Sequence, residues 1–259
     1  MDLSLKGKYA LVCGGSKGIG LASAIEMSRQ GCNVTLLSRN VHDLSQALKL
    51  LYKNDNQVHR FIVADQSNPE EVSRRFATIP HGFHILVLNS GGPKAGKIID
   101  STTQDLQVAF NNLLLSSQII VRHSYTYMKN AIYGRIINII SIGLKEPIPG
   151  LGVSNTIRGA VGNWSKTLAY ELGPDGITVN NVLPGYTLTD RLSHLMEQRA
   201  KDRGIEKEDV IQTYLDQIPL KRLASPNEIG NVVAFIASPA AGYINGVNLP
   251  VDGGYLKSL

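Results

Sequence analysis

The chain is poor in cysteine and lacks any long apolar run. Its 259 residues include two cysteines, Cys13 and Cys32, each within an apolar stretch. Neither the spacing of a metal site nor that of a disulfide framework is present, so we expect no metal and predict a reducing, cytoplasmic location. No run approaches the roughly 18 apolar residues of a membrane span, and the first residues lack a signal-peptide pattern. The sequence therefore predicts a soluble protein without a membrane partner.

The sequence also lacks a concentrated basic region. Lys and Arg number 26 against 21 Asp and Glu, and the two signs are interleaved in stretches such as 199–209. A nucleic-acid surface needs a denser basic cluster with elements that enter a groove or stack on bases. The sequence therefore favours no nucleic-acid partner, whereas its formal charge of +5 suits an anionic cofactor or substrate.

No linker, internal repeat or low-complexity tract divides the chain. With 43% hydrophobic and 18% charged residues, it is long enough to bury a sizeable core. Short apolar runs alternate with stretches of helical spacing, and this alternation predicts one doubly wound α/β domain over residues 1–259. The expected strands are 8–13, 33–38, 58–64, 85–89, 134–140, 177–183 and 247–251. The expected helices are 21–30, 41–52, 69–77, 103–128, 154–172 and 226–237, with a charged, helical flap at 191–217 that breaks at Gly204.

A glycine-rich turn follows the first predicted strand. Its sequence is Gly14-Gly-Ser-Lys-Gly-Ile-Gly20, and a segment with helical spacing begins directly after it. In this context glycines let the backbone approach a pyrophosphate, whose charge meets free N–H groups at the helix N-terminus. Taken alone, the glycines could equally form a plain turn between strand and helix. The residues that we assign to a dinucleotide are Gly14, Ser16, Lys17, Gly18, Ile19 and Gly20.

The residue after the second predicted strand indicates which dinucleotide binds. An acidic residue there would accept hydrogen bonds from a free ribose 2′-hydroxyl. This chain has Arg39, between Ser38 and Asn40, and we expect Lys17 of the glycine turn to lie close by. A single Arg after a strand could also be a solvated surface charge. Two cations beside hydrogen-bonding side chains favour a 2′-phosphate, and they predict NADP(H) as the cofactor.

Small and polar residues follow three further strands. Asp65 is placed to reach an adenine edge, although an N-cap or turn Asp would look the same in the sequence. The turn at 89–92 allows close approach to a ribose, and the pair Asn111-Asn112 indicates a kink or a polar network within a predicted helix, because Asn competes with the backbone for hydrogen bonds. The cofactor residues that we predict after these strands are Asp65, Gln66, Asn89, Ser90, Gly91, Pro184, Gly185 and Thr187.

Taken in order, these motifs resemble those of the short-chain dehydrogenase/reductase family over essentially the whole chain. The resemblance implies an α/β Rossmann fold with a doubly wound, seven-stranded parallel sheet and a nicotinamide cofactor. It also implies a homo-oligomer, commonly a tetramer built on the helices 103–128 and 154–172. Cys13 and Ser90 depart from the family pattern, which has Thr and Asn there. The motifs are Gly14-x-x-x-Gly18-Ile-Gly20, Asn89-Ser-Gly-Gly92, Asn112, Ser141, Asn180-Asn-Val-Leu-Pro184-Gly185 and Asp252-Gly253-Gly254.

The resemblance also implies where the catalytic residues lie. Ser141, after the fifth strand, would hydrogen-bond a substrate carbonyl, and Asn112 would belong to the same site. Family members carry Tyr-x-x-x-Lys about thirteen residues after this Ser, whereas this chain has Ser154 and Arg158, which the four-residue spacing keeps on one helix face. Arg158 can carry positive charge, but Ser154 cannot replace a phenol as an acid, a role worth roughly 10²–10⁴-fold in rate.

The sequence leaves three functions open. In the first, which we favour, the chain is an active NADPH-dependent reductase whose proton comes from water or from a group such as Lys145 or Tyr186. A conjugated enone would suit such a site, because hydride addition leaves an enolate, which is less basic than an alkoxide. In the second, the chain is an ordinary 3-oxoacyl or sugar-type ketone reductase that works slowly with Ser154 and Arg158. In the third, it is a non-catalytic NADP-binding scaffold or sensor.

Two narrower resemblances favour the first function. The dienoyl-CoA reductases of the family carry Ser-x-x-x-Lys at the positions of Ser154 and Arg158. Reductases of bacilysin-type antibiotic pathways also have a replacement for the Tyr. The chain is similar to them in Lys145-Glu-Pro147, in Thr189-Asp-Arg191 and in Lys257-Ser258 after the Asp252-Gly-Gly motif.

The substrate itself is less well indicated by the sequence. We expect its pocket between the loop after Ser141 and the flap 191–217. Lys145, Arg158 and Arg191 hint that this small molecule carries an anionic group, such as a carboxylate or a carrier phosphate.

Overall fold

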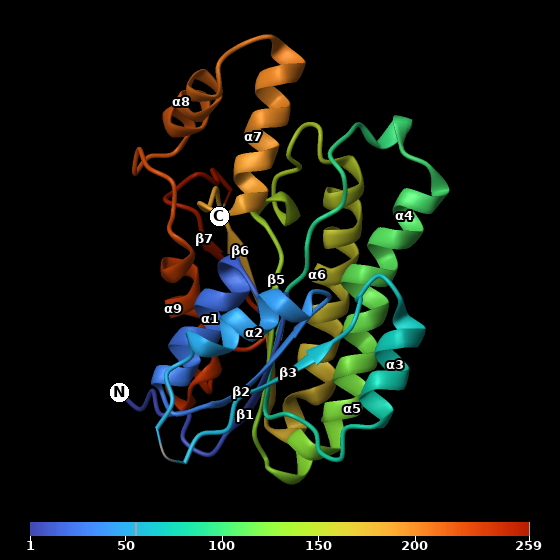
Figure 1. The fold of residues 1–259 in the computed structure, drawn as a ribbon, viewed down its shortest axis with the longest axis vertical. Helices are drawn as coiled ribbons and strands as arrows, with labels where there is room; N and C mark the ends of the chain where they lie inside the picture. Colours follow the sequence, from blue (N-terminus) through green and yellow to red (C-terminus); the bar gives the residue numbers. More distant parts are fainter. Residues whose placement is uncertain (55, 259) are drawn as a thin grey trace.

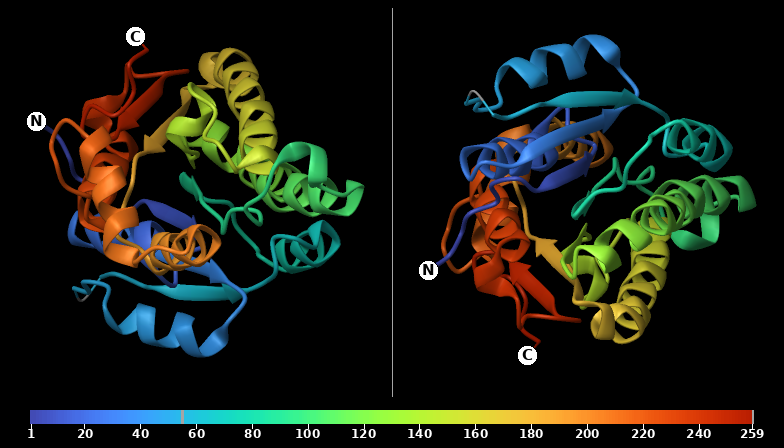
Figure 2. Two further views of the ribbon diagram at one scale, coloured as in Figure 1. Left: turned by 90° about the horizontal axis from the view of Figure 1, so that it is seen from above. Right: turned by 90° about the horizontal axis from the view of Figure 1, so that it is seen from below.

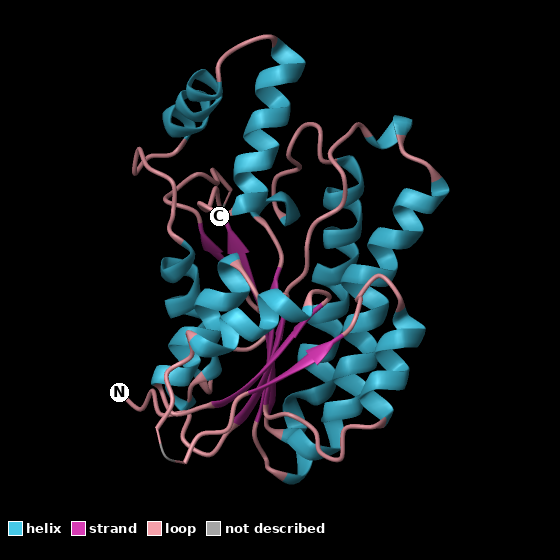
Figure 3. Cartoon of the chain, in the orientation of Figure 1, coloured by secondary structure: helices cyan, strands magenta, loops and turns pink. Residues whose placement is uncertain are grey.

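A parallel sheet of seven strands forms the centre of the protein, in the order β3-β2-β1-β4-β5-β6-β7. The structure is a computed structural model that describes residues 1–54 and 56–258. Its architecture confirms the predicted Rossmann fold and the doubly wound sheet (Figure 3). The strands are β1 (Tyr9–Cys13), β2 (Asn33–Ser38), β3 (Arg60–Val63), β4 (Ile85–Leu88), β5 (Gly134–Ile139), β6 (Ile177–Pro184) and β7 (Asn248–Val251).

The central strands are buried along their whole length because helices cover both faces of the sheet. Every residue of β4, β5 and β6 is buried. The parallel register aligns a row of side chains across four strands, in which Leu86 pairs with Leu11 and Ile136, and Ile136 pairs with Val179. This row packs under the helices of one face, so a one-residue slip in register would exchange the two buried surfaces.

Two sets of helices enclose the sheet (Figures 1 and 2). One face is covered by α1 (Gly18–Arg29), α2 (Val41–Lys49) and α9 (Pro226–Ala237). The other face is covered by α3 (Pro69–Ala77), α4 (Thr103–Phe110), α5 (Ser116–Asn130) and α6 (Gly152–Leu172). Short turns complete the succession: η1 (Ile98–Asp100), η3 (Ile142–Leu144), η4 (Gly173–Asp175) and η5 (Pro239–Ala241).

The helix predicted at 103–128 extends to Asn130 and contains one turn of π geometry. A π turn, η2 (Asn111–Leu115), separates α4 from α5. Within it the Asn112 amide donates to the Gly91 carbonyl at 3.0 Å, and the Asn111 oxygen accepts from Gln107. The amide pair therefore forms the polar network that the sequence indicated. Two other helices begin earlier than predicted, α1 at Gly18 and α6 at Gly152.

Two helices, α7 (Asp190–Arg203) and α8 (Lys207–Gln217), lie above the carboxyl ends of the strands (Figure 1). Gly204 ends α7 with φ +64°, a left-handed conformation that glycine adopts without strain. Together these helices form the flap, and they have a small apolar cluster of their own: Leu192, Met196, Ala200, Val210 and Tyr214. Within the described residues, no helix is long and apolar enough to span a membrane.

Buried amides join the last three strands below the loops that follow them. The Asn138 amide donates to Asn181 at 3.0 Å and to Ser165 at 2.9 Å, and Asn181 donates to Asn248 at 2.7 Å. An unpaired amide would be costly in this interior. The chain of mutual bonds therefore fixes how β5, β6 and β7 present their carboxyl ends.

His84 lies buried at the opposite edge of the sheet, just before β4. Its Nδ1 accepts the backbone N–H of Tyr9 at 3.0 Å, which requires a neutral ring. Burial, and then the charge of Lys8, lowers the pKa of His84 to about 4. The unfolded chain has an ordinary His pKa near 6.5, so it binds more protons than the folded chain between these values.

We therefore expect stability to be lost as the pH falls from about 6.5 to 4. The contribution of His84 to the free energy of unfolding is on the order of 2 kcal/mol above this window. Urea denaturation at pH 7.5, 6, 5 and 4.5 measures it. His84→Gln, which keeps an acceptor but cannot titrate, should flatten the profile, and the exposed His42→Gln should not. A profile unchanged by His84→Gln would contradict the assignment.

Candidate active site at the carboxyl edge of the sheet

The glycine turn between β1 and α1 has the shape of an anion cradle. Gly14 has φ +56°, and a Cβ there would lie 2.6 Å from the Asn89 amide nitrogen. A Cβ at Gly20 would collide with the Gly14 carbonyl oxygen. Lys17, at the N-cap of α1, makes no side-chain cap, so the first N–H groups of the helix stay available to a bound anion. Ile19 packs below them against the core.

The predicted 2′-phosphate residues surround the end of β2. The Ser16 hydroxyl donates to Ser38 at 3.1 Å, which holds the glycine turn against the strand. Arg39 lies 3.8 Å from Asp65, and Lys17 lies 3.0 Å from Asp43. Both cations are exposed, with 75% and 60% of their side-chain surface accessible. Exposed ion pairs contribute little, so a phosphate can compete for both.

The flanking residues have structural roles that the sequence left open. Asn40 caps α2 by accepting the backbone N–H of Asp43 at 3.0 Å. Asp65 accepts both the N–H and the hydroxyl of Ser67, at 2.9 and 2.8 Å, which is the turn alternative for this residue. The carbonyl of the buried Gln66 accepts the Ser116 hydroxyl at 2.6 Å. These hydrogen bonds fix the loop after β3 and leave other polar atoms of the loop available to a ligand.

The loops after β4 and β6 close on the glycine turn. Asn89 donates to the Cys13 and Gly14 carbonyls at 3.2 and 3.4 Å. Ser90 bonds the neighbouring Gly91 at 3.4 Å, and open space surrounds the Cα of Gly91.

The chain beyond β6 covers the same turn from the other side. Gly185 follows Pro184, and a Cβ at Gly185 would lie 2.7 Å from the Cα of Asp252, which explains the small residue there. The buried Thr187 donates to the Gly185 carbonyl at 3.1 Å. A Cβ at Gly18 would lie 3.2 Å from the Thr189 methyl group.

Ser154 and Arg158 form a pair in the first turns of α6. Arg158 Nε donates to the Ser154 hydroxyl at 3.1 Å. Its Nη1 donates to the carbonyls of Ile139 and Ile140 at the end of β5. Burial, and then the charge of Arg191, lowers the pKa of Arg158 to about 10. The guanidinium is therefore still charged at neutral pH.

Ser141 follows Ile140 directly and begins the turn η3. Its hydroxyl oxygen accepts the Gly143 N–H at 3.1 Å. A Cβ at Gly143 would lie 2.9 Å from the Asn155 amide oxygen, so η3 packs closely against α6. Ser141, Ser154 and Arg158 are thereby brought to one edge of the sheet. Asn112 reaches this edge from the other side through its bond to Gly91.

Comparisons with known proteins agree with this geometry. The profile of the family described as Enoyl-(Acyl carrier protein) reductase matches residues 14–256. The 3-oxoacyl-(acyl-carrier-protein) reductase FabG of Pseudomonas aeruginosa is 32% identical, with 99% of this chain and 100% of that protein covered. The chain belongs to the short-chain dehydrogenase/reductase family. The members of this family are NAD(P)-dependent oxidoreductases, and the chain is one of them.

Two relatives with known structures extend the comparison. L-sorbose reductase from Gluconobacter frateurii, solved with NADPH and L-sorbose, has a TM-score of 0.92 and 31% identity over 100% of both chains. YwfH, an NADPH-dependent reductase involved in bacilysin biosynthesis, has a TM-score of 0.90 and 28% identity, covering 97% of this chain and 99% of that chain. The NADPH-dependent reductase BacG of Bacillus subtilis is also 28% identical over 97% of this chain and 99% of its own length.

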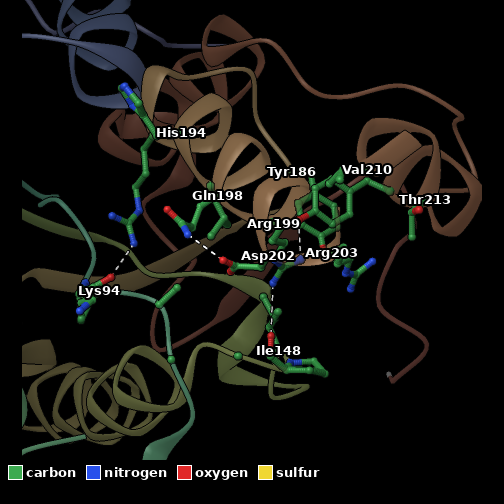
Figure 4. A pocket seen from close by; sticks show the side chains of 18 of the residues that line it. Lys94, Ile148, Tyr186, His194, Gln198, Arg199, Asp202, Arg203, Val210 and Thr213 are labelled. Atoms are coloured by element: carbon green, nitrogen blue, oxygen red, sulfur yellow. Dashed lines mark hydrogen bonds between the residues drawn. The ribbon is translucent and has the colours of Figure 1, made fainter. Parts of the chain in front are cut away.

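An open cleft of about 1230 Å³ lies above the edge of the sheet that carries Ser141, Ser154 and Arg158. The loop after β4, the loop at 148–150 and the flap form its walls, and Gly91 and Tyr186 connect it to the predicted cofactor residues. Figure 4 shows Gln198, Arg199 and Asp202 projecting together from α7 into this space. The predicted positions of the pocket walls thus agree with the cleft, but Lys145 is not among its lining residues.

An aromatic group joins the flap to the floor of the cleft. Tyr186 stacks on Tyr214 with ring centres 4.3 Å apart and meets Tyr255 edge-on at 5.3 Å. Burial, followed by the neighbouring Tyr255, raises the pKa of Tyr186. This phenol therefore holds its proton more tightly than an ordinary Tyr, which makes it a poor proton donor.

The structure adds site residues that the sequence reasoning missed. Four further cations line the cleft, although their spacing in the sequence did not predict this position: Lys94, Lys97, Arg199 and Arg203. The loop at Glu146 also meets the chain near Ser258: the Glu146 carboxylate accepts the backbone N–H groups of residues 257 and 258 at 3.0 and 2.9 Å. Two of the three segments quoted for the resemblance to bacilysin-type reductases are thus in contact.

Arg191 fastens the base of the flap across the cleft. Its guanidinium donates to the Gly92 carbonyl at 2.9 Å and to the Pro93 carbonyl at 3.0 Å. We expect Arg191→Ala to raise the opening constant of the flap roughly 5- to 30-fold, because two hydrogen bonds of about 1 kcal/mol each are lost. Hydrogen exchange of the amides of α8 measures this change. Lys201→Ala, an exposed substitution on the same helix, is the control; equal exchange in both variants would show that Arg191 does not hold the flap.

Proposed function

We propose that this protein is an NADPH-dependent reductase that transfers hydride to a conjugated enone or a carbonyl compound without a phenolic proton donor. The observation that carries the proposal is the bonding of Arg158 to Ser154 and to the two carbonyls at the end of β5. This arrangement supplies a fixed positive charge and oriented hydroxyls at the site, but no acid of ordinary phenol strength.

The residues at the carboxyl edge fit NADP(H). The glycine turn would hold the pyrophosphate, and Ser16, Lys17, Ser38 and Arg39 would hold the 2′-phosphate. Asp65 and Gln66 would face the adenine, and the loops at 89–91 and 184–187 would hold the nicotinamide end. NADPH supplies the hydride when it is bound. The relatives support this choice, because BacG is described as NADPH-dependent and the L-sorbose reductase was solved with NADPH.

Two hydroxyl groups can receive the substrate oxygen. Ser141 already accepts a hydrogen bond from Gly143, and Ser154 accepts one from Arg158. Each hydroxyl therefore keeps its own hydrogen to donate. Preorganised donors of this kind stabilise charge that develops on an oxygen in the transition state.

Two further roles remain: stabilising the anion that hydride transfer produces, which we assign to Arg158, and supplying a proton, which we assign to water. Hydride addition to the β-carbon of an enone leaves an enolate, and the Arg158 cation lowers the energy of this anion. One proton must then reach the α-carbon. Tyr186 is a poor donor because its pKa is raised, so we assign this proton to water. An enolate is less basic than an alkoxide, which makes water sufficient for an enone and slow for a ketone.

A second candidate is the reduction of a ketone of the 3-oxoacyl or sugar type. The similarity to FabG and to L-sorbose reductase favours it. In this case Ser141 and Ser154 would hold the carbonyl oxygen, and Arg158 would stabilise the alkoxide until water protonates it. Turnover would then be slower than with a phenol in the site.

The proposal includes a homo-oligomer, with a tetramer formed on the helices predicted at 103–128 (α4 and α5) and 154–172 (α6). Exposed apolar side chains on this side, such as Val108 at 42% and Tyr170 at 87% of their surface, support it, and light scattering of the purified protein would decide the state. The cytoplasmic location stays a prediction.

The first test concerns the cofactor. We expect Arg39→Asp to weaken NADPH binding roughly 10- to 100-fold, because a charge-assisted bond to the 2′-phosphate is replaced by repulsion. The affinity for NADH should stay the same or rise. Fluorescence titration of both cofactors measures this change, and Arg29→Gln on the exposed side of α1 is the control. Equal losses for the two cofactors would remove Arg39 from the 2′-phosphate site.

The second test concerns the reaction. The protein should oxidise NADPH faster with conjugated enones than with matched saturated ketones, as followed by absorbance at saturating cofactor. Ser141→Ala should lower turnover roughly 10²-fold, the usual size of one lost oxyanion donor. Thr167→Ala, exposed on α6, should leave it unchanged.

A double variant separates the two candidate functions. Ser154→Tyr with Arg158→Lys restores the family pair, and for a ketone reductase it should raise turnover by roughly 10²-fold or more. No gain with ketones would count against the second candidate. NADPH binding without turnover on either substrate class would remove both.

A further inference from the structure

The cleft is lined by positive charges that have no acidic partner. Five cations face it: Lys94, Lys97, Arg191, Arg199 and Arg203. Across residues 1–54 and 56–258, none of the five lies within 4 Å of a carboxylate. Among the described residues of the lining, Asp202 is the single carboxylate, and its oxygen accepts from Gln198 at 2.8 Å.

One cation on the same flap that does not line the cleft, Lys207, has an acidic partner. Lys207, which joins α7 to α8, lies 2.7 Å from Glu197 and bonds Ser193 at 2.7 Å. The charge of Lys207 is thus compensated by a carboxylate. The cleft cations lack such a pair, and their mutual repulsion favours an anionic ligand.

The cations of α7 that border the cleft lie at different distances along the helix from the reaction site. Residues 191, 195, 198, 199 and 202 recur at helical spacing on the face of α7 that borders the cleft. Arg191 lies near the reaction site, since it donates to the carbonyl of Gly92, next to the Gly91 carbonyl that accepts from Asn112. Arg199 lies eight residues farther along the helix, so its Cα is about 12 Å from that of Arg191 at 1.5 Å per residue. This rise sets the scale of the separation between the reaction site and the charge of Arg199.

Arg199 is held in place by neutral acceptors. Its Nη1 donates to the Tyr214 hydroxyl, and its Nη2 donates to the Pro149 carbonyl at 3.3 Å. The guanidinium also lies 5.4 Å from the centre of the Tyr214 ring. Because these partners carry no charge and use only two of the five N–H groups, the positive charge remains available. A side chain fixed in this way loses little freedom when it binds an anion.

We propose that the cleft takes a hydride acceptor that carries a carboxylate or phosphate about 12 Å from the reacting carbon, and that Arg199 binds this remote anion. The inference rests on the proposed reductase function and specifies its substrate class. Tyr214 stacks on Tyr186 beside the predicted nicotinamide end, so the bound anion would also steady the floor of the reaction site.

Matched pairs of substrates test the proposal. One series consists of linear enones with a terminal carboxylate at increasing distance from the alkene, each compared with its methyl ester. A second series carries a terminal phosphate monoester on the same enones, each compared with the parent alcohol. We expect kcat/KM to favour the acid over the ester most strongly near the 12 Å separation, by roughly 10-fold or more. The preference should fall with added salt. The series that shows the larger preference identifies the anion as a carboxylate or as a phosphate.

Three variants assign the effect to Arg199. Arg199→Gln keeps amide donors but removes the charge, and it should abolish the preference for the acid over its ester. Arg199→Lys should restore part of the preference. Lys201→Gln makes the same change of charge on the exposed side of α7 and should have no effect.

Calorimetric titration separates this inference from the proposed function. Adipate and dimethyl adipate are added to the NADPH-loaded protein and to its Arg199→Gln variant. If no substrate is reduced but adipate binds in an Arg199-dependent way, the reductase proposal fails and the anion site stands. If acids and esters are reduced equally well, or adipate binds equally to both proteins, the remote-anion site is wrong while the reductase function survives.

Discussion

A buried guanidinium that is satisfied only by neutral acceptors organises the reactive edge of this protein. Arg158 reaches two successive carbonyls at the end of β5 and one hydroxyl on its own helix. A buried cation is costly unless its hydrogens are bonded, and the planar fork of Arg meets this need where a single ammonium would not. The same side chain thus fixes the end of β5, which leads into Ser141, and the turn of α6 that carries Ser154. Ser154 and Arg158 are therefore complementary, since the guanidinium donates a hydrogen bond that the hydroxyl oxygen accepts.

Bonds from side chains to backbone hold the loops around this edge. Arg191 ties the flap to the loop after β4, and Arg199 ties it to Pro149. The loops themselves meet where the Gly96 N–H donates to Gly150 at 2.7 Å and its carbonyl accepts from Gly152 at 3.0 Å. Neutral acceptors leave the positive charge of both Arg side chains in the cleft. The same contacts therefore shape the cleft and determine its electrostatic character.

The sequence was sufficient for the fold because its signals were local. The apolar runs, the turn at Gly14–Gly20 and the break at Gly204 each depend on a few neighbouring residues, and the structure has all of them. The π turn was only partly predictable, since Asn112 marks an irregularity but its partner Gly91 lies 21 positions away. The cleft was harder still. Arg199 faces it only because α7 is rotated as it is, and α8 and the loop at 148–150 determine that rotation together.

The glycine turn and the helix that follows it pack against elements from the far end of the chain, and this affects the order of folding. A Cβ at Gly230 of α9 would lie 2.8 Å from the backbone of Ala22, so α9 packs directly on the helix that begins at this turn. The same core joins Ala10 of β1 to Val182 of β6 and Val233 of α9. During synthesis the turn leaves the ribosome early, yet these partners follow about two hundred residues later. At a translation rate of roughly 5–20 residues per second, the dinucleotide half stays incomplete for roughly ten seconds or more, and it is exposed to chaperones for that time.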